Sequence, residues 1–120
     1  MKKIIFVYNA DGDLFSSLVD ATHKIISPKT YSCNLCAITY GTLSMKKEWK
    51  SFIENLSLPT QFLHRDEFRK KYPKNKEEFP SIFIKKGQQL CLLISSKEIN
   101  KCNSLADLKY LVSYKIKEFL

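Results

Sequence analysis

Two cysteines separated by two residues carry the clearest chemistry in this 120-residue sequence. They are Cys33 and Cys36, in the stretch Cys33-Asn34-Leu35-Cys36. Two thiolates at this spacing either close a small disulfide ring or bind one soft metal ion such as Zn²⁺. The spacing does not choose between a dithiol redox centre and a zinc site, so both stay open. A third interpretation is structural, with both cysteines packed as small hydrophobic side chains.

A closed tetrahedral zinc site needs more ligands than two cysteines. The chain has two histidines, His23 and His64. His23 lies near the end of a predicted helix, and a turn at Pro28 can bring its ring back to the cysteines. His64 ends a predicted strand and is the weaker candidate. The predicted metal ligands are therefore Cys33, Cys36, His23 and His64.

The other two cysteines carry less chemistry. Cys91 alternates within a predicted hairpin strand and is expected in the core, whereas Cys102 precedes the last predicted helix as a free thiol. A chain with 44% hydrophobic residues does not need disulfides, so reduced thiols are expected. No apolar run reaches the roughly 18 residues of a membrane span, and no cleavage site follows the apolar start. These features predict a cytoplasmic protein without a membrane segment.

The chain is strongly basic, with a formal net charge of +8. Only Arg65 and Arg69 are arginines, and the remaining basic residues are lysines. Because lysine lacks the bidentate fork that reads guanine, sequence-specific DNA binding is disfavoured. The densest basic run either forms a solvated loop or meets an acidic protein partner through Lys70, Lys71, Lys74 and Lys76. The second reading makes the chain a non-catalytic binding module with structural cysteines.

Hydrophobic periodicity predicts alternating strands and helices. The sequence contains no glycine-rich phosphate-binding motif and no GxSxG nucleophile motif, so nucleotide and hydrolase chemistry have no support. The predicted strands are Lys3–Asn9, part of Tyr31–Gly41, Thr60–His64 and a hairpin within Pro80–Ile94; the predicted helices are 14–26, 44–56, 66–71 and 104–120. This order predicts one α/β domain over residues 1–120, with a mixed sheet of about five strands flanked by helices on both faces.

The second half of the chain has a more specific pattern. From Phe62 onward come a strand, a short helix, Phe79-Pro80-Ser81, a hairpin with Lys85-Lys86-Gly87 at its turn, and a closing helix. This half resembles the C-terminal half of a thioredoxin-fold domain. The resemblance implies a thioredoxin-like fold in which Pro80 is cis and lies beside an active-site dithiol.

The cysteine pair is expected to depart from the thioredoxin pattern. In redox-active thioredoxin folds the pair caps a helix directly after a strand, where the helix dipole lowers the pKa of the first thiol. Here the pair is predicted at the start of the second strand, and metal binding is slightly favoured. If strand polarity follows the thioredoxin pattern, His64 points to the opposite end of the sheet from Cys33.

Several short phrases carry a second resemblance. They are Tyr8-Asn9-Ala10-Asp11, Cys33-Asn34-Leu35-Cys36, Thr39-Tyr40-Gly41 and the run Phe62–Phe68. These phrases resemble those of a group of short bacterial proteins with no assigned function. The resemblance implies relatives and no particular reaction.

Overall fold

A computed structural model of the protein describes residues 2–9, 34–39 and 45–119. Four strands in this part of the chain form one mixed sheet in the order β2-β1-β3-β4. The strands are β1 (Lys2–Val7), β2 (Thr60–Leu63), β3 (Ser81–Lys86) and β4 (Gln89–Ile94). The protein is therefore an α/β protein with a mixed sheet, as the sequence predicts.

The central strand is β1, which pairs with a different neighbour along each edge. It runs parallel to β2, with Ile4 opposite Thr60, and antiparallel to β3, with Ile4 opposite Ile84. Its continuous β-branched and aromatic run is typical of a strand that is covered on both faces. The last four residues of β1 are accordingly all buried.

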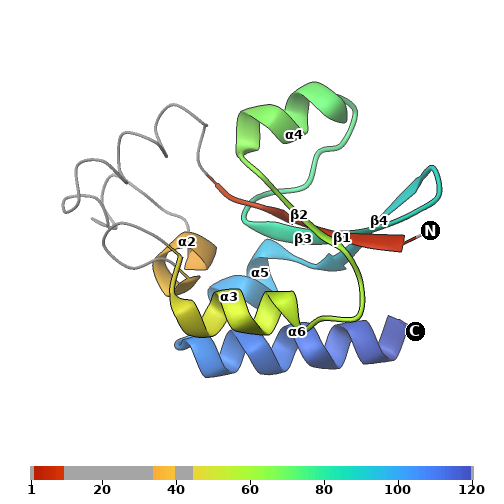
Figure 1. The fold of residues 1–120 in the computed structure, drawn as a ribbon. Coiled ribbons are helices and arrows are strands. Elements are labelled where there is room, and N and C mark those ends of the chain that lie inside the picture. Colours follow the sequence, from red (N-terminus) through yellow and green to blue (C-terminus); the bar gives the residue numbers. More distant parts are fainter. Residues whose placement is uncertain (1, 10–33, 40–44, 120) are drawn as a thin grey trace.

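Alternate side chains of β1 enter two separate hydrophobic clusters, because successive side chains of a strand point to opposite faces. Ile4 and Phe6 belong to the larger cluster, whereas Ile5 and Val7 belong to the smaller one. The smaller cluster includes Phe68 of α4 (Arg65–Lys71). Figure 1 shows α4 on one side of the sheet and the long C-terminal helix on the other.

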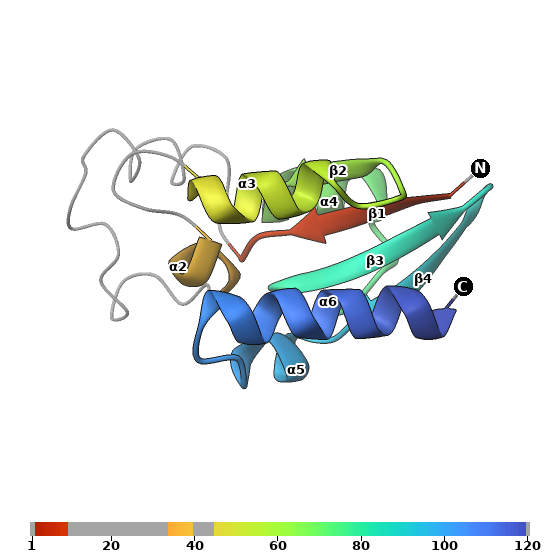
Figure 2. The same cartoon turned by 60° about the horizontal axis from the view of Figure 1, so that its bottom comes forward.

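The other four described helices contribute side chains to the larger cluster. They are α2 (Asn34–Thr39), α3 (Lys47–Glu54), α5 (Ser96–Asn100) and α6 (Leu105–Phe119). Figure 2 shows α3 and α6 running side by side across the same face of the sheet. Trp49 of α3 is fully buried there, with its ring edge against Phe6 at 5.7 Å between centroids. Among the described helices, none is long and apolar enough to cross a membrane.

The prediction of a second strand within Tyr31–Gly41 is wrong. The stretch Tyr31–Gly41 contains helix α2, so the described sheet has four strands where about five were expected. Leu35, Ile38 and Thr39 are buried at helical spacing, and the Thr39 hydroxyl donates to the Leu35 carbonyl at 2.6 Å. Burial on one helix face thus outweighs the β propensity of this stretch. The predicted helix 14–26 lies outside the described residues.

The hairpin and the remaining helices lie where the sequence predicts them. β3 and β4 are antiparallel, and Gly87 at their turn has a φ of 62°, a left-handed conformation that favours glycine. The short helix α5 was not predicted. Its signal is present, because Ser95 and Glu98 form a capping box in which the Ser95 hydroxyl accepts from the Glu98 amide at 3.2 Å.

Phe68 is expected to be a stability hot spot of the smaller cluster. Its ring is fully buried and stacks on Phe83 at 4.8 Å between centroids. Phe68→Ala should lower the free energy of unfolding by about 3 to 5 kcal/mol, measured by urea denaturation. Tyr110→Ala is the control, because Tyr110 is 73% exposed and should change stability by no more than about 0.5 kcal/mol. Equal effects of the two variants would contradict this assignment of the core.

Candidate functional site

One end of the sheet collects the residues with the most chemistry. The parallel strands β1 and β2 end there and β3 begins there, because Val7 is paired with both Leu63 and Ser81. Residues that follow neighbouring parallel strands lie at the same end of the sheet. This is the end at which α/β folds place their functional groups. We call this region the site end. Figure 1 shows that α2 also lies beyond the end of β1.

The predicted cysteine pair is described only in part. Cys36 is the third residue of α2, whereas Cys33 and His23 lie outside the described residues. Because α2 begins at Asn34, the residue after Cys33, the prediction that the pair lies at the start of a strand is wrong. The motif instead runs into the first turn of a helix.

Helix α2 is held beside the end of β1 by its buried face. Leu35 and Ile38 belong to the larger cluster together with Tyr8, the residue that follows β1. The backbone amide of Lys46 donates to the Thr39 carbonyl at 2.8 Å, which ties the end of α2 to the start of α3. These contacts fix the backbone of Cys36 near the site end.

His64 follows β2 and caps α4, where Glu67 holds it in two ways. A single Glu67 carboxylate oxygen accepts from the His64 backbone amide at 2.7 Å and lies 2.8 Å from His64 Nδ1. The backbone hydrogen bond is the main reason that the pKa of Glu67 lies below its ordinary value. This contact between the Glu67 carboxylate and Nδ1 orients the His64 ring.

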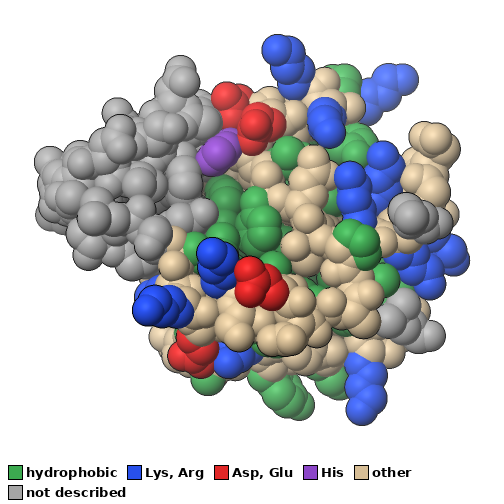
Figure 3. All heavy atoms as spheres, in the orientation of Figure 1, with side chains coloured by type: hydrophobic (Ala, Val, Ile, Leu, Met, Phe, Trp, Pro, Cys, Tyr) green, Lys and Arg blue, Asp and Glu red, His purple; other side chains and the backbone are tan. Residues whose placement is uncertain are grey.

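His64 therefore lies at the same end of the sheet as α2. The prediction that His64 and Cys33 lie at opposite ends involves Cys33, which is outside the described residues. Tyr8 belongs to the larger cluster together with Leu35 and Ile38 of α2, and its ring centroid lies 6.0 Å from that of the His64 ring. The His64 side chain is partly exposed beside Glu67, and Figure 3 shows histidine and acidic side chains together on this face of the molecule.

Three polar residues at this end were not predicted to be site residues. The Arg65 guanidinium donates to the Asn9 side-chain oxygen at 3.2 Å, which joins the residues that follow β1 and β2. Tyr8 is almost fully buried beneath them. Their signal in the sequence is that each lies at the end of a predicted strand or just after it. On the same end the Phe79–Pro80 peptide bond is cis and leads into β3.

Metal ligands do not gather among the described residues. In residues 2–9, 34–39 and 45–119, no group of three or more His, Cys, Asp or Glu side chains is placed to hold a metal ion. Cys102 is buried and its thiol donates to the Glu98 carbonyl at 3.8 Å, and burial raises the pKa of this thiol. Cys91 is half-buried in β4, and neither of these two cysteines is in a disulfide.

The basic segment after α4 is shaped by Arg69. Its guanidinium donates to the carbonyls of Asn75 and Glu77, the latter at 2.9 Å, and lies 4.5 Å from the centre of the Phe79 ring. The Arg69 guanidinium therefore stabilises the turn at Asn75 and Glu77. The four predicted partner lysines, in contrast, are all exposed: Lys70, Lys71, Lys74 and Lys76.

Comparison of the chain with protein-family models, curated proteins and solved structures found no match. The geometry of the described residues is therefore the basis on which a function is argued.

The lowered pKa of Glu67 gives a test of the site end. Because the folded pKa is lowered, the ionised carboxylate stabilises the protein above the ordinary pKa, and this stability is lost as the pH falls through the folded value. NMR titration of Glu67 should give a midpoint below 4.5, the ordinary glutamate value.

Two variants at position 64 separate backbone from side chain in this effect. His64→Ala keeps the backbone amide and should retain most of the lowering, whereas His64→Pro removes that amide and should raise the pKa of Glu67 towards its ordinary value. The backbone φ of −86° at His64 suits proline. An equal shift in both variants would contradict the backbone origin of the effect.

Proposed function

We propose that this chain is a thioredoxin-like domain whose Cys33 and Cys36 act as a dithiol redox centre. The observation that carries the proposal is that α2 begins directly after Cys33 and lies at the site end. The resemblance implies a dithiol at the start of a helix, near the proline that leads into the hairpin. Pro80 leads into β3 at the same end.

The order of the elements supports the fold part of the proposal. The order β2, α4, Pro80, β3–β4 hairpin and α6 is the one that the resemblance implies, with the short helix α5 inserted between the hairpin and α6. Helices on both faces of the sheet are part of the proposed fold. In support, Phe68 of α4 lies in the smaller cluster, whereas α2, α3, α5 and α6 supply side chains to the larger one.

The proposed reaction is thiol–disulfide exchange. One cysteine of the pair attacks a disulfide of the substrate as its thiolate and forms a mixed disulfide, with release of one substrate thiolate. The second cysteine then attacks the sulfur of the first, which forms the disulfide of the pair and releases the other substrate thiolate. The pair loses two protons and two electrons and becomes a disulfide, while the substrate disulfide is reduced to two thiols. His64, oriented by Glu67, is a group at the same end that can accept a proton.

A zinc site is the alternative use of the same cysteines. Its ligands would be Cys33, Cys36 and His23, with His64 as the fourth. The position of His64 at the same end of the sheet as α2 favours its inclusion in this set. Neutral imidazole and two thiolates are ligands that Zn²⁺ binds in tetrahedral sites.

The two chemistries differ in what the purified protein contains and does. Protein purified under reducing conditions should hold no zinc by mass spectrometry of its metals, and oxidised glutathione should convert Cys33 and Cys36 to an intramolecular disulfide. The Cys33→Ser/Cys36→Ser variant should lose this reaction. Cys91→Ser/Cys102→Ser is the matched control and should keep it, because those thiols are half-buried or buried. A content of about one zinc per chain that the Cys33→Ser/Cys36→Ser variant loses would contradict the dithiol proposal and support the zinc site.

A second candidate function is a binding module for an acidic protein partner. The observation that favours it is that Arg69 holds the turn at Asn75 and Glu77 while the lysines around it remain exposed. A fixed turn with exposed positive charges presents them to a partner without a large ordering cost. In this reading the cysteines only pack.

Replacing the four lysines tests this second function. The variant in which Lys70, Lys71, Lys74 and Lys76 are all changed to Gln should bind poly-glutamate more weakly than the native chain at low salt. The difference should shrink as salt is added, because salt screens exposed charges. Fluorescence anisotropy of labelled poly-glutamate measures both effects. If the variant binds poly-glutamate as tightly as the native chain at low salt, the segment is only a solvated loop and the second function is contradicted.

A further inference from the structure

The outer edge of β4 is open to another strand. β4 is the last strand of the sheet and pairs only with β3, so its other edge has no backbone partner among the described residues. Its six residues include no charge and no proline, two features that natural edge strands use against unwanted pairing. Backbone groups along such an edge are the recognition element in β-strand addition.

Two open hollows lie near the two ends of this strand and share lining residues. The first, of about 510 Å³, is lined by Leu90 and by the segment 72–75. The second, of about 660 Å³, is lined by the segment 74–78 and by Ser95, Ser96 and Lys97. Because Lys74 and Asn75 line both, the two hollows adjoin, one at the start of β4 and one just past its end. We call the two hollows together the β4 trough.

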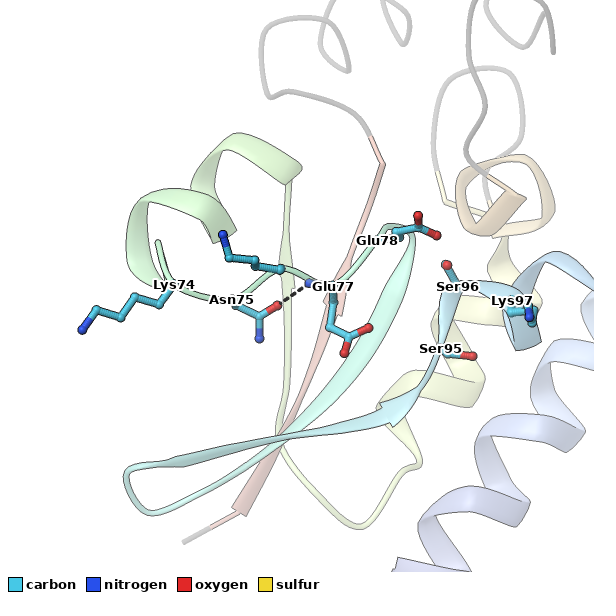
Figure 4. A pocket seen from close by; sticks show the side chains of 8 residues that line it. Lys74, Asn75, Glu77, Glu78, Ser95, Ser96 and Lys97 are labelled. Atoms are coloured by element: carbon cyan, nitrogen blue, oxygen red, sulfur yellow. Dashed lines mark hydrogen bonds between the residues drawn. The ribbon is translucent and has the colours of Figure 1, made fainter.

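Figure 4 shows the two walls of the second hollow. Glu77 and Glu78 lie on one side, and Ser95, Ser96 and Lys97 lie on the other, where β4 leads into α5. The Glu77 backbone amide donates to the Asn75 side-chain oxygen at 2.9 Å. Together with the Arg69 contacts to the carbonyls of the same two residues, this bond fixes the wall opposite β4.

The α4 face of β4, next to the trough, is apolar. Leu92 is opposite Phe83 and Leu90 is opposite Lys85, and directly opposed residues share a face of the sheet. Phe83 belongs to the smaller cluster, so both leucines lie on the α4 face. Leu92 is 40% exposed there, and Leu90 is half-buried. A strand added at this edge would cover apolar surface as well as pair its backbone.

The exposed charge around the trough is mostly positive. Lys74, Lys76 and Lys97 line it and are exposed, against two carboxylates of Glu77 and Glu78. A second copy of this chain at the same edge would bring these lysines against their own counterparts. An acidic segment would pair with them. A nucleic acid strand offers phosphates but no row of amide groups to match the strand edge.

We propose that the β4 edge and its trough bind an extended acidic peptide segment, which adds to the sheet as a fifth strand beside β4. The inference rests on the second candidate function and specifies its partner. Main-chain hydrogen bonds to β4 provide the register, Leu90 and Leu92 provide apolar contact, and the lysines select for acidic side chains.

A labelled peptide of alternating valine and glutamate, long enough to span β4, is the probe. It should bind the native chain by fluorescence anisotropy and slow the hydrogen exchange of outward-pointing amides in residues 89–94, measured by NMR. Two control peptides of equal length should not bind. One alternates valine and lysine, and the other is the acidic peptide with N-methyl groups on the amides of one edge.

Variants of the trough separate its parts. Leu92→Lys should weaken binding of the acidic peptide although it adds a positive charge, and partial exposure of Leu92 makes the change compatible with folding. Lys74→Gln/Lys97→Gln should weaken binding by about threefold to tenfold. Lys47→Gln/Lys50→Gln removes the same charge from the exposed side of α3 and should leave binding unchanged.

The outcomes are distinct. Binding of poly-glutamate without protection of β4 by the acidic peptide would overturn β4 as the docking edge and leave the second candidate function intact. Binding of neither probe would overturn both. Sedimentation that shows a dimer built on β4, and unaffected by the acidic peptide, would assign the edge to a second copy. Binding of oligouridylate that the Lys74→Gln/Lys97→Gln variant loses, with no binding of the acidic peptide, would assign the trough to nucleic acid.

Discussion

The structure depends on a single strand that is covered on both faces and paired on both edges. β1 provides side chains to both hydrophobic clusters, and its backbone bonds β2 on one edge and β3 on the other. The parallel pairing also includes the residue before β2 and the residue after β1, through bonds from the Ile4 amide to the Pro59 carbonyl at 2.9 Å and from the Tyr8 amide to the Leu63 carbonyl at 3.0 Å. The residues that follow the two parallel strands are consequently held next to each other.

Local patterns made most of the described fold predictable. The strands, the hairpin turn at Gly87 and the helices α3, α4 and α6 each have a continuous period or a turn signal in the sequence. Helix α2 was missed because Ile38, Thr39 and Tyr40 favour a strand by propensity. What decides its structure is burial of Leu35 and Ile38 against distant residues, which no local window contains.

The candidate site was predictable in its residue types and less so in its geometry. His64 was identified from its chemistry, and its neighbour Glu67 follows at a spacing that a capping box explains. The bond between Asn9 and Arg65 joins residues 56 positions apart and depends on the parallel register of β1 and β2. Such a contact can be read from a sequence only once strand order and polarity are known. The same holds for the trough, since its walls come from the segments after α4 and after β4.

The only two arginines of this basic chain both serve the chain itself. Arg65 bonds Asn9 across two strand ends, and Arg69 holds the carbonyls of Asn75 and Glu77. The exposed positive charge therefore resides on lysines, whose amines can be acetylated, whereas guanidinium groups cannot. Acetylation would remove charge from the β4 trough while both arginine contacts persist. Because the arginines hold the fold and the lysines carry the surface charge, the charge of the surface can change while the contacts that stabilise the fold remain.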